Sequence, residues 1–472
     1  NTEGYDAIVE NPFLEAAREP LSTFSIDVDT ASYSNVRRFL VHSMLPPRGA
    51  VRIEEFVNTF DYAYAEPIDE HPFSVDVEVA TCPWRTGNRL VRIGLKGRTV
   101  PKDRRPASNL VFLLDVSGSM QPANKLPLVQ QAMRELTAQL DERDRVGIVT
   151  YAGTSGLVLP STPGHEKDAV LGAIDRLRAS GSTNGAAGIQ LAYEQAVQHF
   201  VEGGINRVIL CTDGDFNVGV TSHSELVSLI EDRARTGVFL SVLGFGMGNY
   251  KDDRLEKLAD RGNGHYAYID GEREARRVLV DGLAGTLITI AKDVKIQVEF
   301  NPAEVAAYRL LGYENRALTN RDFNDDAKDA GEIGAGHTVT AFYEVVPAGG
   351  TVPGPATDPL KYQAPAQPRA DAAHSGELLT VKLRYKLPAG TTSTKLEVAA
   401  VDHGATWSQA SRDFKFAAAV ASFAMLLRDS AFRGTATFEQ ILELAEEGKG
   451  ADPRGQRAEF LELVRQAKGL KR

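Results

Sequence analysis

One segment, Val111-Phe112-Leu113-Leu114-Asp115-Val116-Ser117-Gly118-Ser119-Met120, indicates the fold class of this chain of 472 residues. It opens with four apolar residues, and so short an apolar run is typical of a buried parallel strand. Asp115 stands at the carboxyl end of that strand, and Ser117 and Ser119 follow with Gly118 between them. The glycine allows a tight backbone turn. A carboxylate and two hydroxyl groups on one loop can bind a hard cation such as Mg²⁺, which prefers oxygen ligands.

Two further loops can supply the remaining ligands, because open parallel sheets bind ligands outside the carboxyl ends of their strands. Thr183 lies in a loop of small residues between two helical segments and offers a third hydroxyl group. The stretch 207–214 is another apolar run that ends in an acid, Asp213. Serine and aspartate are also common where helices begin, but capping alone explains three such loops poorly. The sequence therefore predicts a metal site made of Asp115, Ser117, Ser119, Thr183 and Asp213.

These five residues, in this order, resemble the metal-ion-dependent adhesion site of a von Willebrand factor type A domain. In that family the hydroxyl groups and the two aspartates surround a divalent cation, Mg²⁺ or Ca²⁺, and one coordination position stays open for a carboxylate of a partner protein. Hydroxyl ligands leave the cation under-neutralised, so an incoming Asp or Glu gains a strong charge-assisted contact. The resemblance implies a non-enzymatic, adhesion-type module that binds a protein partner.

The order of predicted elements favours an α/β fold with a doubly wound, mostly parallel, Rossmann-like sheet. Apolar residues at helical spacing follow the Asp115 loop from Leu126 to Leu140, and a buried strand is expected at 144–151. A helix from Glu272 to about Ile290 is expected to close the domain. The glycines at 244–248 do not have the spacing of a dinucleotide-binding fingerprint, so they predict only a tight turn.

Strand-like alternation before and after this sheet, at 73–96 and 294–401, predicts a flanking β-sandwich-like region, and helical patterns follow to the end of the chain. We hypothesise that the two β-rich stretches form one sandwich into which the central domain is inserted, since domain termini usually lie close together. The predicted division is an N-terminal α+β region (1–105), a von Willebrand factor A domain (106–290), a β-rich region (291–405) and C-terminal helices (406–472).

Composition restricts the classes of partner. A net charge of −10 argues against nucleic acid or an anionic membrane surface as the main partner. Cys82 and Cys211 are the two cysteines and cannot form a disulfide framework. No apolar run reaches the roughly eighteen residues that a membrane-spanning helix needs. The first residue is Asn1 and not methionine, which leaves open a signal peptide or lipid anchor removed from the chain.

Five longer phrases are similar to bacterial YfbK-type von Willebrand factor A proteins, so that resemblance covers almost the whole chain. They lie at 20–33, 51–56, 213–219, 262–270 and 329–337. Members of that family are typically extracytoplasmic and often lipid-anchored. The resemblance therefore implies a location in the cell envelope or periplasm, with a membrane tether through an N-terminal lipid anchor.

Two other functions stay open. One is an extracytoplasmic scaffold in which a structural cation only stabilises the sheet edge, and the other is a metal-dependent hydrolase that uses the cation as a Lewis acid. A hydrolase needs a base or nucleophile, yet the H-E-x-x-H, G-x-S-x-G and Walker motifs do not occur, and His265 is the nearest histidine candidate. Asp27 and Asp29 resemble the nucleophile loop of haloacid dehalogenase phosphatases, but a strand that leads into a capped helix is the simpler interpretation. We expect no enzymatic activity.

Overall fold

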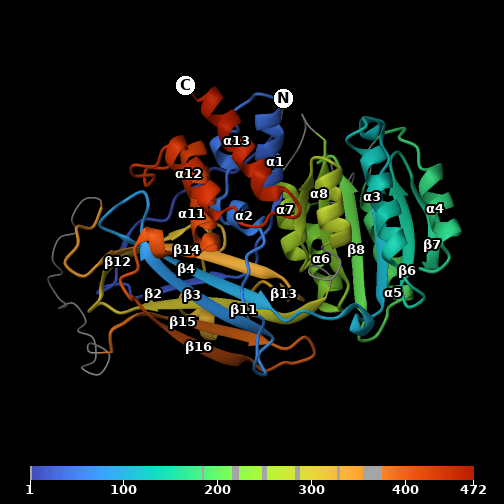
Figure 1. The fold of residues 1–472 in the computed structure, drawn as a ribbon. Coiled ribbons are helices and arrows are strands. Elements are labelled where there is room, and N and C mark those ends of the chain that lie inside the picture. The colour runs from blue at the N-terminus through green and yellow to red at the C-terminus, as the bar shows by residue number, and fades with distance from the viewer. Residues whose placement is uncertain are drawn as a thin grey trace. The chain divides into compact units, whose positions relative to one another are not determined.

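The computed structural model describes residues 3–182, 185–214, 223–246, 252–281, 288–326, 330–353 and 375–471. The chain forms two compact units, which are described separately (Figure 1). The first unit comprises Asn1–Asp6, Asp29–Asn35 and Val100–Ile288, and the second comprises Ala7–Val28, Val36–Thr99 and Thr289–Arg472. Within the described ranges, no helix combines the length and the apolar character needed to cross a lipid bilayer.

The first unit contains a six-stranded sheet with the strand order β10-β9-β8-β5-β6-β7. Its strands are β5 (Ser108–Asp115), β6 (Arg145–Tyr151), β7 (Ser155–Pro163), β8 (Ile205–Thr212), β9 (Phe239–Phe245) and β10 (Tyr266–Ile269). All neighbours are parallel except β7, which pairs with β6 in antiparallel fashion at one edge. Every residue of β5 is buried, which confirms the buried parallel strand predicted before Asp115.

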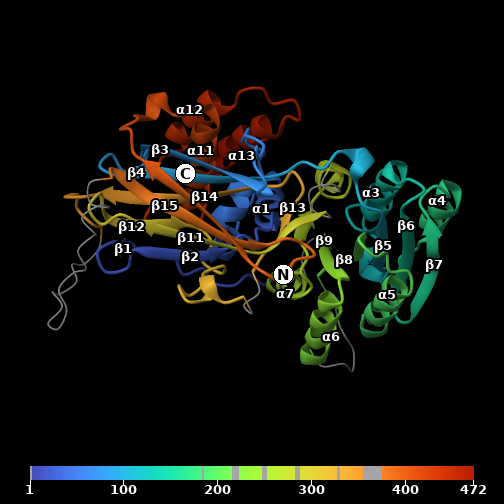
Figure 2. The same ribbon diagram turned by 90° about the horizontal axis from the view of Figure 1, so that it is seen from below.

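Helices cover both faces of this sheet, as a doubly wound fold requires. They are α3 (Leu126–Gln139), α4 (Lys167–Arg176), α5 (Ala186–Gln198), α6 (His223–Arg235), α7 (Asp252–Arg261) and α8 (Glu272–Arg276). In Figure 2, α3 and α4 lie on one face, and α5 and α6 lie on the other. On the second face, alternate residues of β5 such as Val111 and Leu113 pack against Ile189 and Tyr193 of α5 in one apolar core.

The prediction of a helix from Glu272 to about Ile290 was wrong at the C-terminal end of the helix. The α-helix α8 stops at Arg276 and continues as one π-helical turn, η4 (Arg277–Asp281). The strand β11 (Thr289–Phe300) has already begun at Thr289, which pairs with Gly334. The β-branched residues Thr289 and Ile290 suit a strand better than a helix, so local propensity agrees with this correction.

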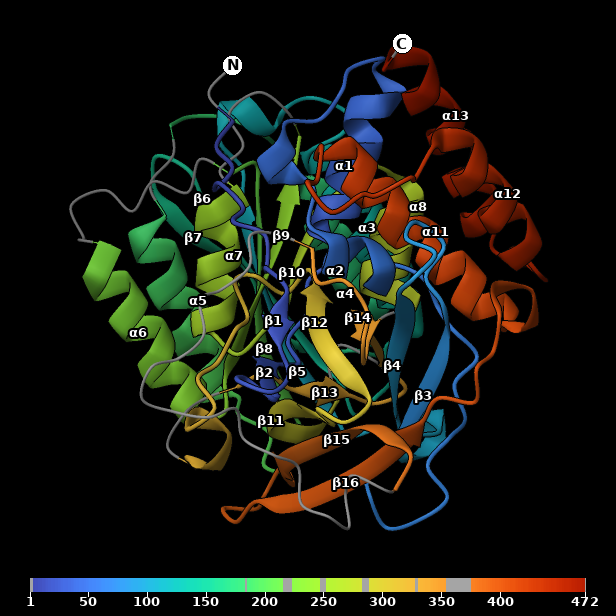
Figure 3. The ribbon, with the colours of Figure 1, turned by 90° about the vertical axis from the view of Figure 1, so that its left-hand side faces the viewer.

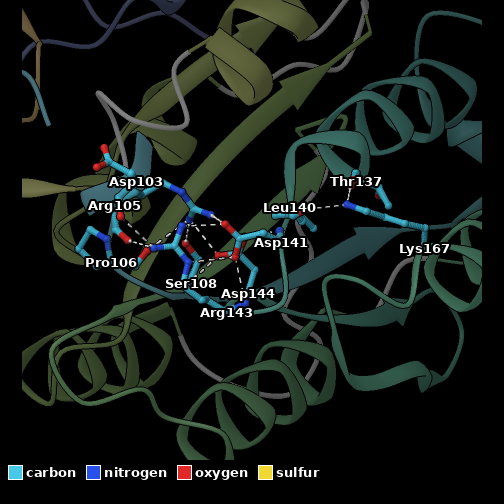
Figure 4. A network of polar contacts seen from close by, with 10 residues as sticks. All are labelled: Asp103, Arg105, Pro106, Ser108, Thr137, Leu140, Asp141, Arg143, Asp144 and Lys167. Atoms are coloured by element: carbon cyan, nitrogen blue, oxygen red, sulfur yellow. Dashed lines mark hydrogen bonds and ion pairs between the residues drawn. The ribbon is translucent and has the colours of Figure 1, made fainter. Parts of the chain in front are cut away.

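A buried ion pair joins the amino ends of β5 and β6 (Figure 4). Arg105 donates from its two Nη atoms to Asp144, at 2.9 Å to Oδ1 and 2.6 Å to Oδ2. The same carboxylate accepts the backbone N–H groups of Ser108 at 3.1 Å and Asp141 at 2.9 Å. Because Ser108 begins β5 and Asp144 directly precedes β6, this network fixes the two strands relative to each other.

The second unit contains two antiparallel sheets (Figure 3), and their buried apolar residues form one core. One sheet has the order β1-β12-β14-β4-β3, and the other has the order β13-β11-β15-β16 with β2 also paired to β11. The strands of the first sheet are β1 (Leu14–Glu15), β12 (Val305–Leu311), β14 (Thr338–Pro347), β4 (Arg89–Gly97) and β3 (Phe73–Thr81). The remaining strands are β2 (Leu21–Ser25), β13 (Ile333–Gly334), β15 (Glu377–Lys386) and β16 (Thr394–Val401).

Strands from both ends of the chain pair inside these sheets. Along its length β4 pairs with β14, from Arg89 opposite Val345 to Lys96 opposite Thr338. In the other sheet β2 pairs with β11, and Phe24 stands opposite Ile296. The segments before residue 100 and after residue 288 therefore build the same two sheets.

Helices of the second unit surround an aromatic cluster. They are α2 (Ile53–Asn58), α11 (Arg412–Leu427), α12 (Phe438–Gly448) and α13 (Gln456–Leu470), while α1 (Ala31–Val41) has residues in both units. Phe423 of α11 lies 6.4 Å from Phe56 and 5.4 Å from Phe460 between ring centroids. Phe414 contacts Phe342 of β14 at 5.8 Å, so α11 packs against the sheet that contains β14, as the apolar pattern of this helix predicts.

Glu54 of α2 carries a buried carboxyl group whose Oε2 atom has no hydrogen-bond partner among the described residues. Burial raises the pKa of Glu54 to about 8, and the charges of Glu314 and Glu55 act in the same direction. The folded protein therefore retains a proton that the unfolded chain releases near pH 4.5. The contribution of this group to stability is complete below pH 4.5 and is lost as the pH rises towards 8.

We expect Glu54→Gln to stabilise the protein at alkaline pH, because the amide needs no bound proton to stay neutral. The free energy of unfolding should exceed that of the wild type by on the order of 1–3 kcal/mol near pH 9 and differ little near pH 4. Urea denaturation at both pH values measures the difference. The exposed Glu70→Gln is the matched control. A difference that does not change with pH would contradict the assignment to Glu54.

Candidate metal centre

The loop that follows β5 brings three of the predicted ligands together. The backbone N–H of Ser117 donates to Asp115 Oδ1 at 2.9 Å, and the hydroxyl oxygens of Ser117 and Ser119 lie 3.0 Å apart. Gly118–Met120 form a single 3-10 turn, η3, which contains Ser119. Asp115 and Ser117 are buried, whereas Ser119 is exposed. The loop therefore offers a buried carboxylate and a hydroxyl group that solvent can reach.

Neighbouring strands orient the second oxygen of Asp115. Tyr151, at the end of β6, donates its hydroxyl to Asp115 Oδ2 at 3.3 Å, and Thr212, at the end of β8, donates to the same atom at 3.5 Å. Both residues are fully buried. Sequence reasoning missed these two side chains, although each ends a predicted strand beside the Asp115 strand. Their place at the carboxyl edge of the sheet was the available signal.

Asp213 directly follows β8 and brings a second carboxylate to the same edge. Burial raises the pKa of Asp115, and the negative charge of Asp213 raises it further. Two carboxylates that repel each other in a buried site favour a positive charge between them. Lys125 Nζ supplies one positive charge, because it donates to Asp213 Oδ2 at 2.9 Å.

Thr183, the fifth predicted ligand, lies outside the described residues, so its role stays a prediction. The described part of its loop does approach the Asp115 loop. Gly118 N donates to Gly181 O at 3.0 Å, and Ser180 N donates to Val116 O at 2.7 Å. These two hydrogen bonds keep the loops side by side.

The donors in this centre fit a hard divalent cation. Two carboxylates and two hydroxyl groups are all oxygen ligands, which Mg²⁺ and Ca²⁺ both prefer over nitrogen or sulfur. The carboxylates are buried and one hydroxyl is exposed, so a cation held here would face solvent on one side. The donor chemistry does not distinguish Mg²⁺ from Ca²⁺.

The other candidates from the sequence have structural contacts within their own units. Burial, together with the positive charge of Arg207, lowers the pKa of His265 to about 4, so its imidazole is neutral near pH 7. Asp29 is buried and accepts the backbone N–H of Tyr266 at 2.8 Å, at the first residue of edge strand β10. Asp27 forms an ion pair with Arg316 at 3.4 Å.

Comparisons with known proteins give matches along the whole chain. The model of the von Willebrand factor type A domain matches residues 109–279, a model described as von Willebrand factor matches 1–92, and one described as Uncharacterized protein YfbK, C-terminal, matches 285–470. The chain is 43% identical over 479 residues to Uncharacterized protein YfbK of Escherichia coli (strain K12), and the match covers 99% of this chain and 82% of that protein.

Two further matches cover a smaller share of the chain or have a lower sequence identity. Inter alpha-trypsin inhibitor, heavy chain 4, of Mus musculus is 26% identical over 184 residues, which cover 37% of this chain and 18% of that protein. A solved structure, von Willebrand factor type A from Catenulispora acidiphila, is 14% identical with a TM-score of 0.47, and the match covers 86% of this chain and 92% of that one.

Proposed function

The chain belongs to the YfbK family of von Willebrand factor type A domain proteins, and from this premise we propose that it is a binding module in which a divalent cation captures a carboxylate of a partner protein. Von Willebrand factor type A domains often mediate protein–protein interactions, and proteins that contain them are generally non-catalytic. The observation that carries the proposal is the clustering of Asp115, Ser117, Ser119 and Asp213 at the carboxyl ends of β5 and β8.

In this proposal the ligands divide into two kinds with different tasks. Asp115 and Asp213 would hold the cation by charge, and the hydroxyl groups of Ser117, Ser119 and Thr183 would complete its oxygen shell. Neutral hydroxyl ligands leave positive charge uncompensated, which favours an incoming Asp or Glu side chain. When bound, the cation, Mg²⁺ or Ca²⁺, supplies an open coordination position for that carboxylate. Tyr151 and Thr212 keep Asp115 oriented towards the loop. No catalytic step belongs to this function.

An extracytoplasmic location, in the cell envelope or periplasm, is also part of the proposal, as is a tether through an N-terminal lipid anchor. Both follow from the resemblance to YfbK-type proteins. Fractionation of source cells, with an antibody against this chain, tests the location, and extraction of the membrane fraction with detergent or with high salt separates a lipid tether from a surface charge contact.

Asp115→Ala is expected to abolish cation-dependent capture of the partner and to leave the fold largely intact. Loss of this carboxylate removes one of two charged ligands, while the strand around it remains paired on both sides. The measurement is a pull-down from envelope extract with the wild type, Asp115→Ala and the exposed surface variant Asp232→Ala, each with Mg²⁺, with Ca²⁺ and with chelator. A protein retained only with a cation by the wild type and by Asp232→Ala, and not retained by Asp115→Ala, would support the proposal and identify the partner.

Thermal unfolding of the same chains reports on the cation without any partner. At about a hundredfold excess over its Kd, a cation should stabilise the wild type by roughly 2.7 kcal/mol and should not stabilise Asp115→Ala. Retention of the same partner in chelator would contradict carboxylate capture. Unfolding of the wild type on removal of the cation would instead indicate a scaffold whose cation is structural.

A further inference from the structure

Lys125 lies immediately before α3 and directs its ammonium group into the candidate metal centre. Its Nζ atom donates to Asp213 Oδ2 at 2.9 Å, and the two side chains are 11% and 5% exposed. Water screens such a buried pair far less than it screens a surface ion pair. The lysine side chain is therefore packed within the centre when no cation is bound.

The carbon chain of Lys125 reaches Asp213 through a slot beside Gly246. A Cβ atom at Gly246 would lie 2.1 Å from Lys125 Cε, so a larger residue there would displace the lysine. Gly246 has a φ of +81°, a left-handed conformation that favours glycine. Its carbonyl oxygen accepts a hydrogen bond from the hydroxyl of Tyr268 in β10. Gly246 therefore leaves the room that the Lys125 side chain occupies.

Lys125 also brings a positive charge to the pair of carboxylates. The donors to Asp115 that the structure describes are neutral groups: the amide and hydroxyl of Ser117 and the hydroxyls of Tyr151 and Thr212. The ammonium group thus compensates part of the negative charge of Asp115 and Asp213, which a bound cation would otherwise compensate.

We propose that Lys125 is an internal counter-ion that competes with the divalent cation for Asp213 and thereby lowers the cation affinity of the centre. The inference rests on the proposed function, because it requires a cation at this site. A divalent cation that shared Asp213 with the ammonium group would be repelled by it, and water screens this repulsion weakly because Lys125 and Asp213 are 11% and 5% exposed. Cation binding therefore requires the ammonium group to move away from Asp213, and the ion pair keeps the carboxylate neutralised when no cation is bound.

The test compares Mn²⁺ binding to the full chain, by calorimetry and by electron paramagnetic resonance, for the wild type and three variants. Lys125→Met removes the charge and keeps the length of the side chain, and Lys125→Arg keeps the charge. Lys257→Met is the matched control, because it removes the same charge from a lysine that is 60% exposed. We expect Lys125→Met to bind Mn²⁺ at least about tenfold more tightly than the wild type, and the other two to bind within about threefold of it.

A second measurement separates this effect from a general loss of packing. Lys125→Met should unfold at a lower temperature than the wild type without a cation and gain more stability than the wild type when Mg²⁺ is added. Lys125→Gln, which can still donate to Asp213 without a charge, replaces the Met variant if that chain does not fold. Unchanged or weaker Mn²⁺ binding by the neutral variants, beside one bound ion in the wild type, overturns the inference and leaves the proposed function standing. Absence of Mn²⁺ binding in all chains overturns both.

Discussion

Asp144→Ala is expected to lower the free energy of unfolding of the first unit by about 3–5 kcal/mol, because the buried guanidinium group of Arg105 then keeps only its longer ion pair with Asp141, at 3.4 Å. Arg105 is 8% exposed and Asp144 is fully buried, so water cannot replace the lost contacts. The change also removes the acceptor for the backbone N–H groups of Ser108 and Asp141. An unsatisfied buried donor adds to the cost.

Calorimetric and urea unfolding of the full chain measure this cost. Asp175→Ala is a suitable control, since Asp175 forms an ion pair of 2.6 Å with Arg134 but both side chains are about half exposed. Its loss should cost less than about 1 kcal/mol. Adding Arg105→Met to Asp144→Ala should recover part of the lost stability, because the buried guanidinium group that lost its main partner is then absent as well. Equal effects of Asp144→Ala and Asp175→Ala would show that burial does not strengthen the Arg105–Asp144 pair.

The sequence was most informative where the relevant residues are close together in the chain. The four apolar residues before Asp115 predicted β5, and the alternating serines predicted the loop, because strand, turn and ligands all lie within ten residues. Asp213 could also be predicted, since a second apolar run ends at it and parallel strands end at a common edge. These local patterns, taken with the strand and helix alternation after them, were enough to predict the doubly wound sheet.

Contacts between distant segments could not be predicted in the same way. Lys125 looks in the sequence like any lysine before a helix, and only the packing beside Gly246 brings it to Asp213. Tyr151 reads as an ordinary strand residue until β6 is paired with β5 and its hydroxyl reaches Asp115. The strand β1 has two residues, too few for any periodicity, and exists because β12 provides its hydrogen-bonding partner.

A second large effect is expected in the second unit, where Glu344→Gln should cost about 3–5 kcal/mol of stability. Glu344 lies on β14 and is fully buried. Its carboxylate accepts hydrogen bonds from Trp84, Asn88 and Arg309 at 3.0, 2.6 and 3.2 Å, and a further one from Arg85. Glutamine keeps the shape but replaces one acceptor oxygen by a donor that faces other donors. Part of this network must then stay unsatisfied.

The charge of Glu344 matters most for Arg309, which is also fully buried. Burial lowers the pKa of Arg309, and the negative charge of Glu344 opposes that shift. Two of its guanidinium nitrogens, Nε and Nη1, have no hydrogen-bond partner among the described residues, and the guanidinium group lies 4.4 Å from the ring of Phe432. Without Glu344 the cation would be stabilised only by the more weakly acting charge of Glu10 and by aromatic rings, which contribute about 0.5–2 kcal/mol.

Urea denaturation of Glu344→Gln, beside the half-exposed strand variant Glu397→Gln, measures the effect. The surface change should alter stability by less than about 1 kcal/mol, since Glu397 pairs with Lys395 in water. Combining Glu344→Gln with Arg309→Met should cost less than the sum of the two single changes, because the buried charge is then absent as well. Additive costs would mean that Glu344 stabilises the sheet through Trp84 and Asn88 and not through the charge of Arg309.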